Sequence, residues 1–173
     1  MIPNSIKTEC SQYLNLLPTP DSWLMKPMKS NTGMSSKIKI RHKKVKAEYE
    51  AEINNVFSSE HQKLLQRCLI AYTSNKSLNL NDDMTLYYVF PINGFKFMYN
   101  PIIDYSLQQY DDLLDKLNDM GSSKRDIFYN TIKLSFKSDS LIEANQNSCE
   151  IIFYNIPYYY AIQKEYFENF MDG

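Results

Sequence analysis

Residues 37–57, KIKIRHKKVKAEYEAEINNVF, decide how the rest of the chain is interpreted. From Val45 to Ile53 an apolar or small residue stands at every second position, and charged residues fill the positions between. This alternation predicts a strand that is buried on one face and charged on the other. Ile38 and Ile40 have the opposite phase, so we expect a bulge or break near residues 42–44.

The first half of this segment is cationic, whereas the second half carries Glu48, Glu50 and Glu52. A concentration of positive charge on one stretch indicates binding to a polyanion, such as an anionic membrane surface or a nucleocapsid. The alternative is an ordinary solvated strand face. The residues expected to bind are Lys37, Lys39, Arg41, Lys43, Lys44 and Lys46.

Charge is divided unevenly along the 173 residues, although the net charge is only −1. Residues 1–46 contain nine Lys or Arg and two acids, a net of +7, and the remainder carries a net of −8. A basic segment attached to an acidic body suits contact with polyanions. The same layout would draw the basic segment of one copy to the body of another.

Residues 1–36 contain four prolines among Ser, Asn and Thr, and show neither helical nor strand periodicity. We therefore expect a flexible basic N-terminal arm. Its apolar stretch, residues 14–25, includes Trp23, the single tryptophan, which packs either on its own domain or on a partner. We expect this stretch to dock on the body of a second copy and drive self-association, through Leu16, Leu17, Pro18, Pro20, Trp23, Leu24 and Met25.

Residues 37–173 are expected to form one α+β domain, with an antiparallel sheet of about five strands packed with two or three helices. Helices are predicted at residues 58–72, 104–120 and in the tail, and Ser58 or Ser59 can cap the first of them. Asn93-Gly94, between two strand-like runs, predicts a hairpin, and Pro91 places its strand at an edge or a bulge. Further strands are predicted at residues 132–136 and 148–160.

No pattern of catalytic or metal-ligating residues is present, so we expect a non-enzymatic protein without cofactor or metal. His42 lies among cations, and His61 has no Cys or His at ligand spacing. The acid pairs at residues 82–83 and 111–112 fit solvated surface, because adjacent carboxylates do not converge on a cleft. Tyrosine clusters at residues 87–88 and 158–160 are weaker candidates for stacking on RNA, since at least one tyrosine of each cluster faces a core.

The three cysteines are widely spaced and indicate no disulfide framework. The sequence contains no run of 18 apolar residues, which a membrane-spanning helix would need. We expect a reducing compartment.

The order of these features resembles the matrix proteins of rhabdoviruses. The similarity covers roughly residues 14–137: a Lys-rich, Pro-containing arm, then the strand and first helix in VKAEYEAEINNVFSSEHQKLLQRCLI, then YYVFPINGFKF and IFYNTIKLSFKSD. The resemblance implies a structural protein of the virion and host-cell cytoplasm, peripheral to membranes. Such a protein would self-associate, condense the viral nucleocapsid and bridge it to the inner membrane face. No PPxY motif is present, and the chain is slightly acidic where family members are often basic.

A second class of function remains open. A small viral or phage-encoded inhibitor that binds and blocks a host protein would have the same size and the same lack of catalytic residues. The two differ in self-association, which a matrix protein needs and an inhibitor does not.

Overall fold

The computed structural model describes residues 1–43, 58–76, 78, 80–102, 115, 117–147 and 150–171. These residues form one antiparallel sheet of seven strands together with six α-helices. The predicted α+β class and antiparallel sheet are confirmed, and the sheet is larger than expected. The strands lie in the order β2-β7-β4-β1-β3-β6-β5.

The N-terminal third of the chain is well integrated in this fold. It contains α1 (Asn4–Glu9), α2 (Ser11–Leu16), two short 3-10 helices (Pro20–Ser22 and Ser30–Thr32), β1 (Met25–Lys29) and β2 (Ser35–Lys39). The expectation of a flexible arm over residues 1–36 is therefore corrected. Its physical reason is a helical stripe in which Ile6, Cys10, Tyr13 and Leu17 are all buried at spacings of four, three and four residues.

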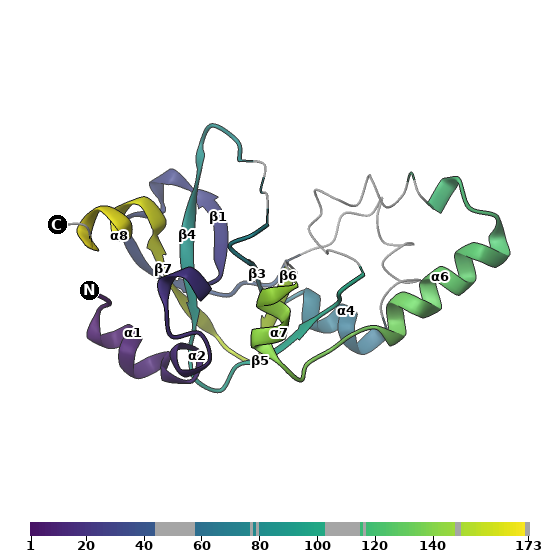
Figure 1. The fold of residues 1–173 in the computed structure, drawn as a ribbon, viewed down its shortest axis with the longest axis horizontal. Coiled ribbons are helices and arrows are strands. Elements are labelled where there is room, and N and C mark those ends of the chain that lie inside the picture. Colours follow the sequence, from purple (N-terminus) through teal and green to yellow (C-terminus); the bar gives the residue numbers. More distant parts are fainter. Residues whose placement is uncertain are drawn as a thin grey trace.

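The remaining elements complete the sheet and its two layers of helices. They are α4 (Ser59–Leu65), β3 (Leu69–Tyr72), β4 (Met84–Pro91), β5 (Lys96–Tyr99), α6 (Ser122–Leu134), α7 (Leu141–Gln146), β6 (Glu150–Tyr154), β7 (Tyr158–Gln163) and α8 (Lys164–Met171). In Figure 1, α1 and α8 lie at one end of the molecule with both chain termini, and α6 extends at the other end.

The predicted Asn93-Gly94 hairpin is wrong in its pairing. β4 pairs with β7, and β5 pairs with β6, so the two strands do not pair with each other and lie in different parts of the sheet. Gly94 takes a φ of 88°, and its carbonyl accepts a hydrogen bond from Asn155 in the opposite bend. The Asn93 side chain instead connects this bend to α1 and α2, through hydrogen bonds with Thr8, Ser11 and the backbone amide of Gln12.

Two other segments form a different type of secondary structure from the one predicted, in whole or in part. The expected helix over residues 58–72 ends at Leu65, and residues 69–72 form strand β3; the predicted cap at Ser58 is present, since its Oγ accepts from the His61 amide. The expected strand over residues 132–136 belongs mainly to helix α6. The predicted strand over residues 45–53 and most of the helix over residues 104–120 lie outside the described residues.

The larger core lies between the sheet and α1, α2 and α8. Trp23 is at its centre, 2% exposed, with its ring edge-on to Tyr88, Phe90 and Phe167 at centroid distances of 5.0–5.4 Å. The indole N–H donates to the Leu17 carbonyl at 2.9 Å. A second cluster joins β3, β5 and β6 to α6 through Met98, Ile152 and Ile132.

Candidate polyanion-binding pocket

A pocket of about 750 Å³ opens between β1, β2 and the chain that follows β2. The strand pairing places β2 at the edge of the sheet, and two strands, β7 and β4, lie between β2 and β1. Residues 40–43 then leave the edge strand and cross to the end of α4. They are fixed by two backbone hydrogen bonds, from the Ile40 amide to the Pro157 carbonyl and from the Lys43 amide to the Gln66 carbonyl.

Positive charge dominates the lining of this pocket. Its polar lining otherwise comes from Asn31, Thr32 and Ser36, and among the residues that the structure describes no Asp or Glu lines it. An ammonium group without a carboxylate partner is satisfied by water or by a bound anion. The cationic lining residues are Lys26, Lys29, Lys37, Lys39, Arg41 and Lys43.

Four of the six cations predicted from the sequence are thus brought to one pocket: Lys37, Lys39, Arg41 and Lys43. Lys44 and Lys46 lie outside the described residues. Their role in binding stays a prediction. The structure adds Lys26 and Lys29, which lie outside the charged segment and come to the pocket through the pairing of β1 with β4, of β4 with β7 and of β7 with β2.

Lys26 differs from the other cations that line the pocket because it is partly buried, whereas they are exposed. Its ammonium donates to the Ile70 carbonyl at 3.0 Å. Burial lowers the pKa of this ammonium to about 8, and the charge of Lys43 acts in the same direction. The charge of Lys43 thus repels that of Lys26, whereas the buried Glu150 carboxylate acts on Lys26 in the opposite direction.

Lys37 borders the pocket but its charge is engaged elsewhere. Its Nζ lies 3.8 Å from the centroid of the Tyr158 ring and 3.8 Å from Glu9 Oε2. A hydrogen bond with Tyr158, followed by the nearby Glu9 carboxylate, raises the pKa of Lys37. Successive residues of a strand face opposite sides, so Lys37 faces the Tyr158 side of β7 while Ile38 faces the Tyr159 side.

The apolar part of the lining comes from four elements of the sheet. Met28, Ile38, Ile40, Leu69 and Tyr159 contribute, with Cys68 beside them. The Tyr159 hydroxyl reaches across β4 to the Met28 sulfur at 3.6 Å, so the floor spans the strands from β7 to β1. Burial raises the pKa of Tyr159 to about 12 and that of Cys68 to about 11, so both are neutral at pH 7.

The residues expected to drive self-association lie apart from this pocket, and most are inside the core. Leu17, Trp23, Leu24 and Met25 are 0–4% exposed. The expected docking of residues 14–25 on a second copy is therefore corrected, because the chain's own helices and sheet already bury them. Leu16, at 38% exposed, and Pro18 remain at the surface, and Pro20 is partly buried.

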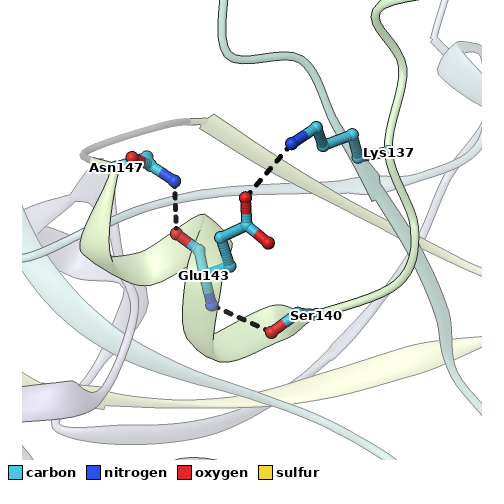
Figure 2. Close-up of polar contacts among 4 residues, drawn as sticks. All are labelled: Lys137, Ser140, Glu143 and Asn147. Atoms are coloured by element: carbon cyan, nitrogen blue, oxygen red, sulfur yellow. Dashed lines mark hydrogen bonds and ion pairs between the residues drawn. The ribbon is translucent and has the colours of Figure 1, made fainter.

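Other polar groups in the described residues have structural roles. Figure 2 shows the cluster at α7, where Lys137 pairs with Glu143 at 3.1 Å, Ser140 caps the helix, and Asn147 donates to the Glu143 carbonyl. His61 lies against the Phe136 ring at 4.2 Å, and His42 contacts Gln66 at 3.3 Å. In this part of the chain no three His, Cys, Asp or Glu residues are placed to hold a metal ion.

Among the described helices, none has the length and apolar character needed to cross a bilayer. Comparison of the chain with family models, with curated proteins and with solved structures gave no match.

Proposed function

We propose that this protein is a non-enzymatic, polyanion-binding protein that holds phosphate groups of a nucleic acid in the pocket between β1 and β2. The observation that supports this is a lining of six cations, to which the described residues contribute no Asp or Glu. Lys29, Lys39, Arg41 and Lys43 are all exposed there, so a ligand can reach them from solvent. A concave site favours a strand that can enter it over a flat membrane surface.

The matrix role implied by the resemblance is one form of this function. In that role the pocket would take RNA-borne phosphates of the viral nucleocapsid, while copies of the protein associate and contact the inner, anionic membrane face. Each surface cation near an anionic bilayer contributes roughly 1 kcal/mol. The proposed localisation is then the virion and the host-cell cytoplasm, peripheral to membranes.

The rival proposal, a small inhibitor of a host protein, is favoured by one observation. The N-terminal segment that would have linked copies is packed in the chain's own core, with Ile6, Cys10 and Tyr13 fully buried. Light scattering against salt separates the two. Salt-sensitive higher oligomers support the matrix role, and a monomer or dimer at every salt concentration supports the inhibitor.

Binding itself is tested with a labelled single-stranded RNA and fluorescence anisotropy. We expect the triple variant Lys29→Gln, Lys39→Gln, Lys43→Gln to weaken binding by about 30-fold or more, since each lost charged contact contributes on the order of 1 kcal/mol. The control carries the same change in net charge at Lys96, Lys124 and Lys133, which are exposed on β5 and α6. Equal losses in both variants would show a response to net charge and overturn the pocket proposal.

A separate experiment tests whether a membrane surface is the ligand instead. Sedimentation with vesicles that contain an anionic lipid is compared with sedimentation of neutral vesicles. Vesicle binding that is lost in the pocket variant, with no RNA binding by the native chain, would make lipid headgroups the ligand and overturn the choice of nucleic acid.

A further inference from the structure

The pocket has two kinds of lining, and a site for phosphate alone would need only one. Cations form one part of the lining, and apolar side chains such as Met28, Ile38 and Tyr159 form the other part, the apolar wall. Met28 and Ile38 are both partly exposed, so their apolar surface is open to a ligand. Water against such a surface is released when a flat apolar group covers it.

The size of the pocket agrees with more than a phosphate. Sites for small organic ligands have volumes of about 300–1,000 Å³ and combine apolar walls with a few polar groups, and this pocket has about 750 Å³. A phosphate group at the cations would leave the apolar wall uncovered. A nucleotide offers both parts at once, an anionic phosphate and a flat base with an apolar face.

We infer that the pocket takes a short single strand, with successive phosphates at the exposed cations Lys29, Lys39, Arg41 and Lys43 and one base against Met28, Ile38 and Tyr159. This inference rests on the proposed function and deepens it by naming the class of nucleic acid. In a duplex the base faces are already stacked and paired, so no base reaches the apolar wall. Base stacking accepts every base, so little sequence preference is expected.

Lys26, which also lines the pocket, supports this arrangement. Its ammonium donates to the Ile70 carbonyl and is repelled by the charge of Lys43. A phosphate that lies near Lys43 would relieve the repulsion between the two ammonium groups. The base would then point away from the cations and toward the sheet floor.

The test uses the full chain and two labelled oligonucleotides of equal length and charge, about eight nucleotides long, within the usual site sizes of about 4–16. One is an intact single strand and the other is an abasic strand with the same phosphate backbone. We expect the intact strand to bind about tenfold more tightly in a fluorescence anisotropy titration. A duplex of the same length should bind no better than the abasic strand.

The variant Ile38→Ser on the edge strand removes apolar wall and leaves every cation in place. We expect it to lose the preference for the intact strand and to keep its affinity for the abasic strand. Met28→Ala serves the same purpose if Ile38→Ser does not fold, and Ile142→Ser, on the exposed side of α7, is the matched control.

The outcomes separate the two proposals. Equal binding of intact and abasic strands by the native chain would overturn the base pocket and leave phosphate binding standing. Binding of neither strand would overturn the proposed function together with this inference. A preference for the intact strand that survives both Ile38→Ser and Met28→Ala would place the base elsewhere and overturn the assignment.

Discussion

Lys26 is the residue at which stability and binding are in conflict. A charged amine that is partly buried, with its pKa lowered to about 8, destabilises the folded chain at neutral pH. The hydrogen bond to the Ile70 carbonyl and the attraction of the buried Glu150 carboxylate offset part of this cost. Because other cations line the same pocket, we expect a bound anion to offset the remainder of this cost.

The variant Lys26→Met tests this explanation. Below pH 8 the amine is charged in both the folded and the unfolded chain, and only the folded chain carries the burial cost. Between pH 8 and 10.5 the folded chain loses the proton first, so its stability rises with pH. We therefore expect Lys26→Met to stabilise the chain by about 1 kcal/mol at pH 7 and to flatten this rise, as measured by urea denaturation.

Lys29→Met, at an exposed position on the same strand, is the control, and it should change stability by less than about 0.5 kcal/mol. The difference between native and variant is the quantity to compare, because Tyr13, Tyr88 and Tyr159 also titrate above pH 10. Their raised pKa values contribute stability that is lost as pH rises through them. An unchanged slope between pH 8 and 10 in the variant would contradict the assignment.

Trp23 carries a second prediction at the scale of the residue. Its ring contacts three aromatic rings and its N–H has a buried partner, so Trp23→Ala leaves a large cavity and an unsatisfied carbonyl at Leu17. We expect a loss of about 3–5 kcal/mol in the free energy of unfolding. Leu16→Ala, at a 38% exposed position, should cost well under about 1 kcal/mol. If Trp23→Ala kept native-like stability but weakened self-association, the result would favour the hypothesis that residues 14–25 dock on a second copy.

Among the elements, β1 determines whether the sheet exists as one unit. It pairs with β4 over five residues and meets β3 only at Met25 and Tyr72, so it joins the group β2-β7-β4 to the group β3-β6-β5. Pro27 is tolerated in this strand because the pairing with β3 stops before it. The N-terminal segment is therefore a structural link between the two groups of strands.

Deletion of residues 1–36 should consequently abolish folding. The deletion removes α1, α2 and β1, and with them the residues that cover one side of the larger core. We expect the truncated chain to show no cooperative unfolding transition by circular dichroism, whereas the full chain shows one. Limited proteolysis of the full chain gives an independent check, since no early cut is expected within residues 4–29. A stable, cooperative fragment that begins near residue 37 would contradict this and return the segment to a flexible arm.

The sequence predicted some elements well for physical reasons that hold locally. The α+β class and the antiparallel sheet followed from alternating runs, and the cap at Ser58 followed from its hydroxyl beside a helical stripe. The error at residues 66–72 arose because a short apolar run fits a helix face or a buried strand equally well, and pairing with β6 selects the strand. The N-terminal helices were missed because prolines nearby outweighed the stripe from Ile6 to Leu17.

The candidate site was predicted only in part, for a related reason. Residues 37–43 were found because their charges lie close together in the sequence. Lys26 and Lys29 were not, because their place beside that segment depends on long-range pairing of β1 with β4 and on the crossing of residues 40–43 to Gln66. The apolar wall depends on the same pairing, since the contact between Met28 and Tyr159 spans a strand that lies between them.

At the scale of the whole molecule, the pocket concentrates positive charge on a chain whose net charge is only −1. The acidic remainder repels a polyanion, so a long nucleic acid would contact the protein chiefly where the cations gather. Binding of this kind is driven by release of counterions from the phosphates and is strongly weakened by salt.

The dependence of binding affinity on salt concentration reports how many phosphates the protein neutralises. It therefore distinguishes binding in the pocket from a diffuse electrostatic attraction. Each phosphate neutralised on a single strand contributes about −0.7 to the slope of log K against log salt concentration. Contacts from the four exposed cations Lys29, Lys39, Arg41 and Lys43 predict a slope of about −3 for the native chain. Anisotropy titrations at several salt concentrations should show this slope reduced by about 2 in the variant with Gln at residues 29, 39 and 43. The matched variant at Lys96, Lys124 and Lys133 should keep the native slope. A native slope in the pocket variant would mean that the phosphates are bound elsewhere on the molecule, even if its affinity were lower.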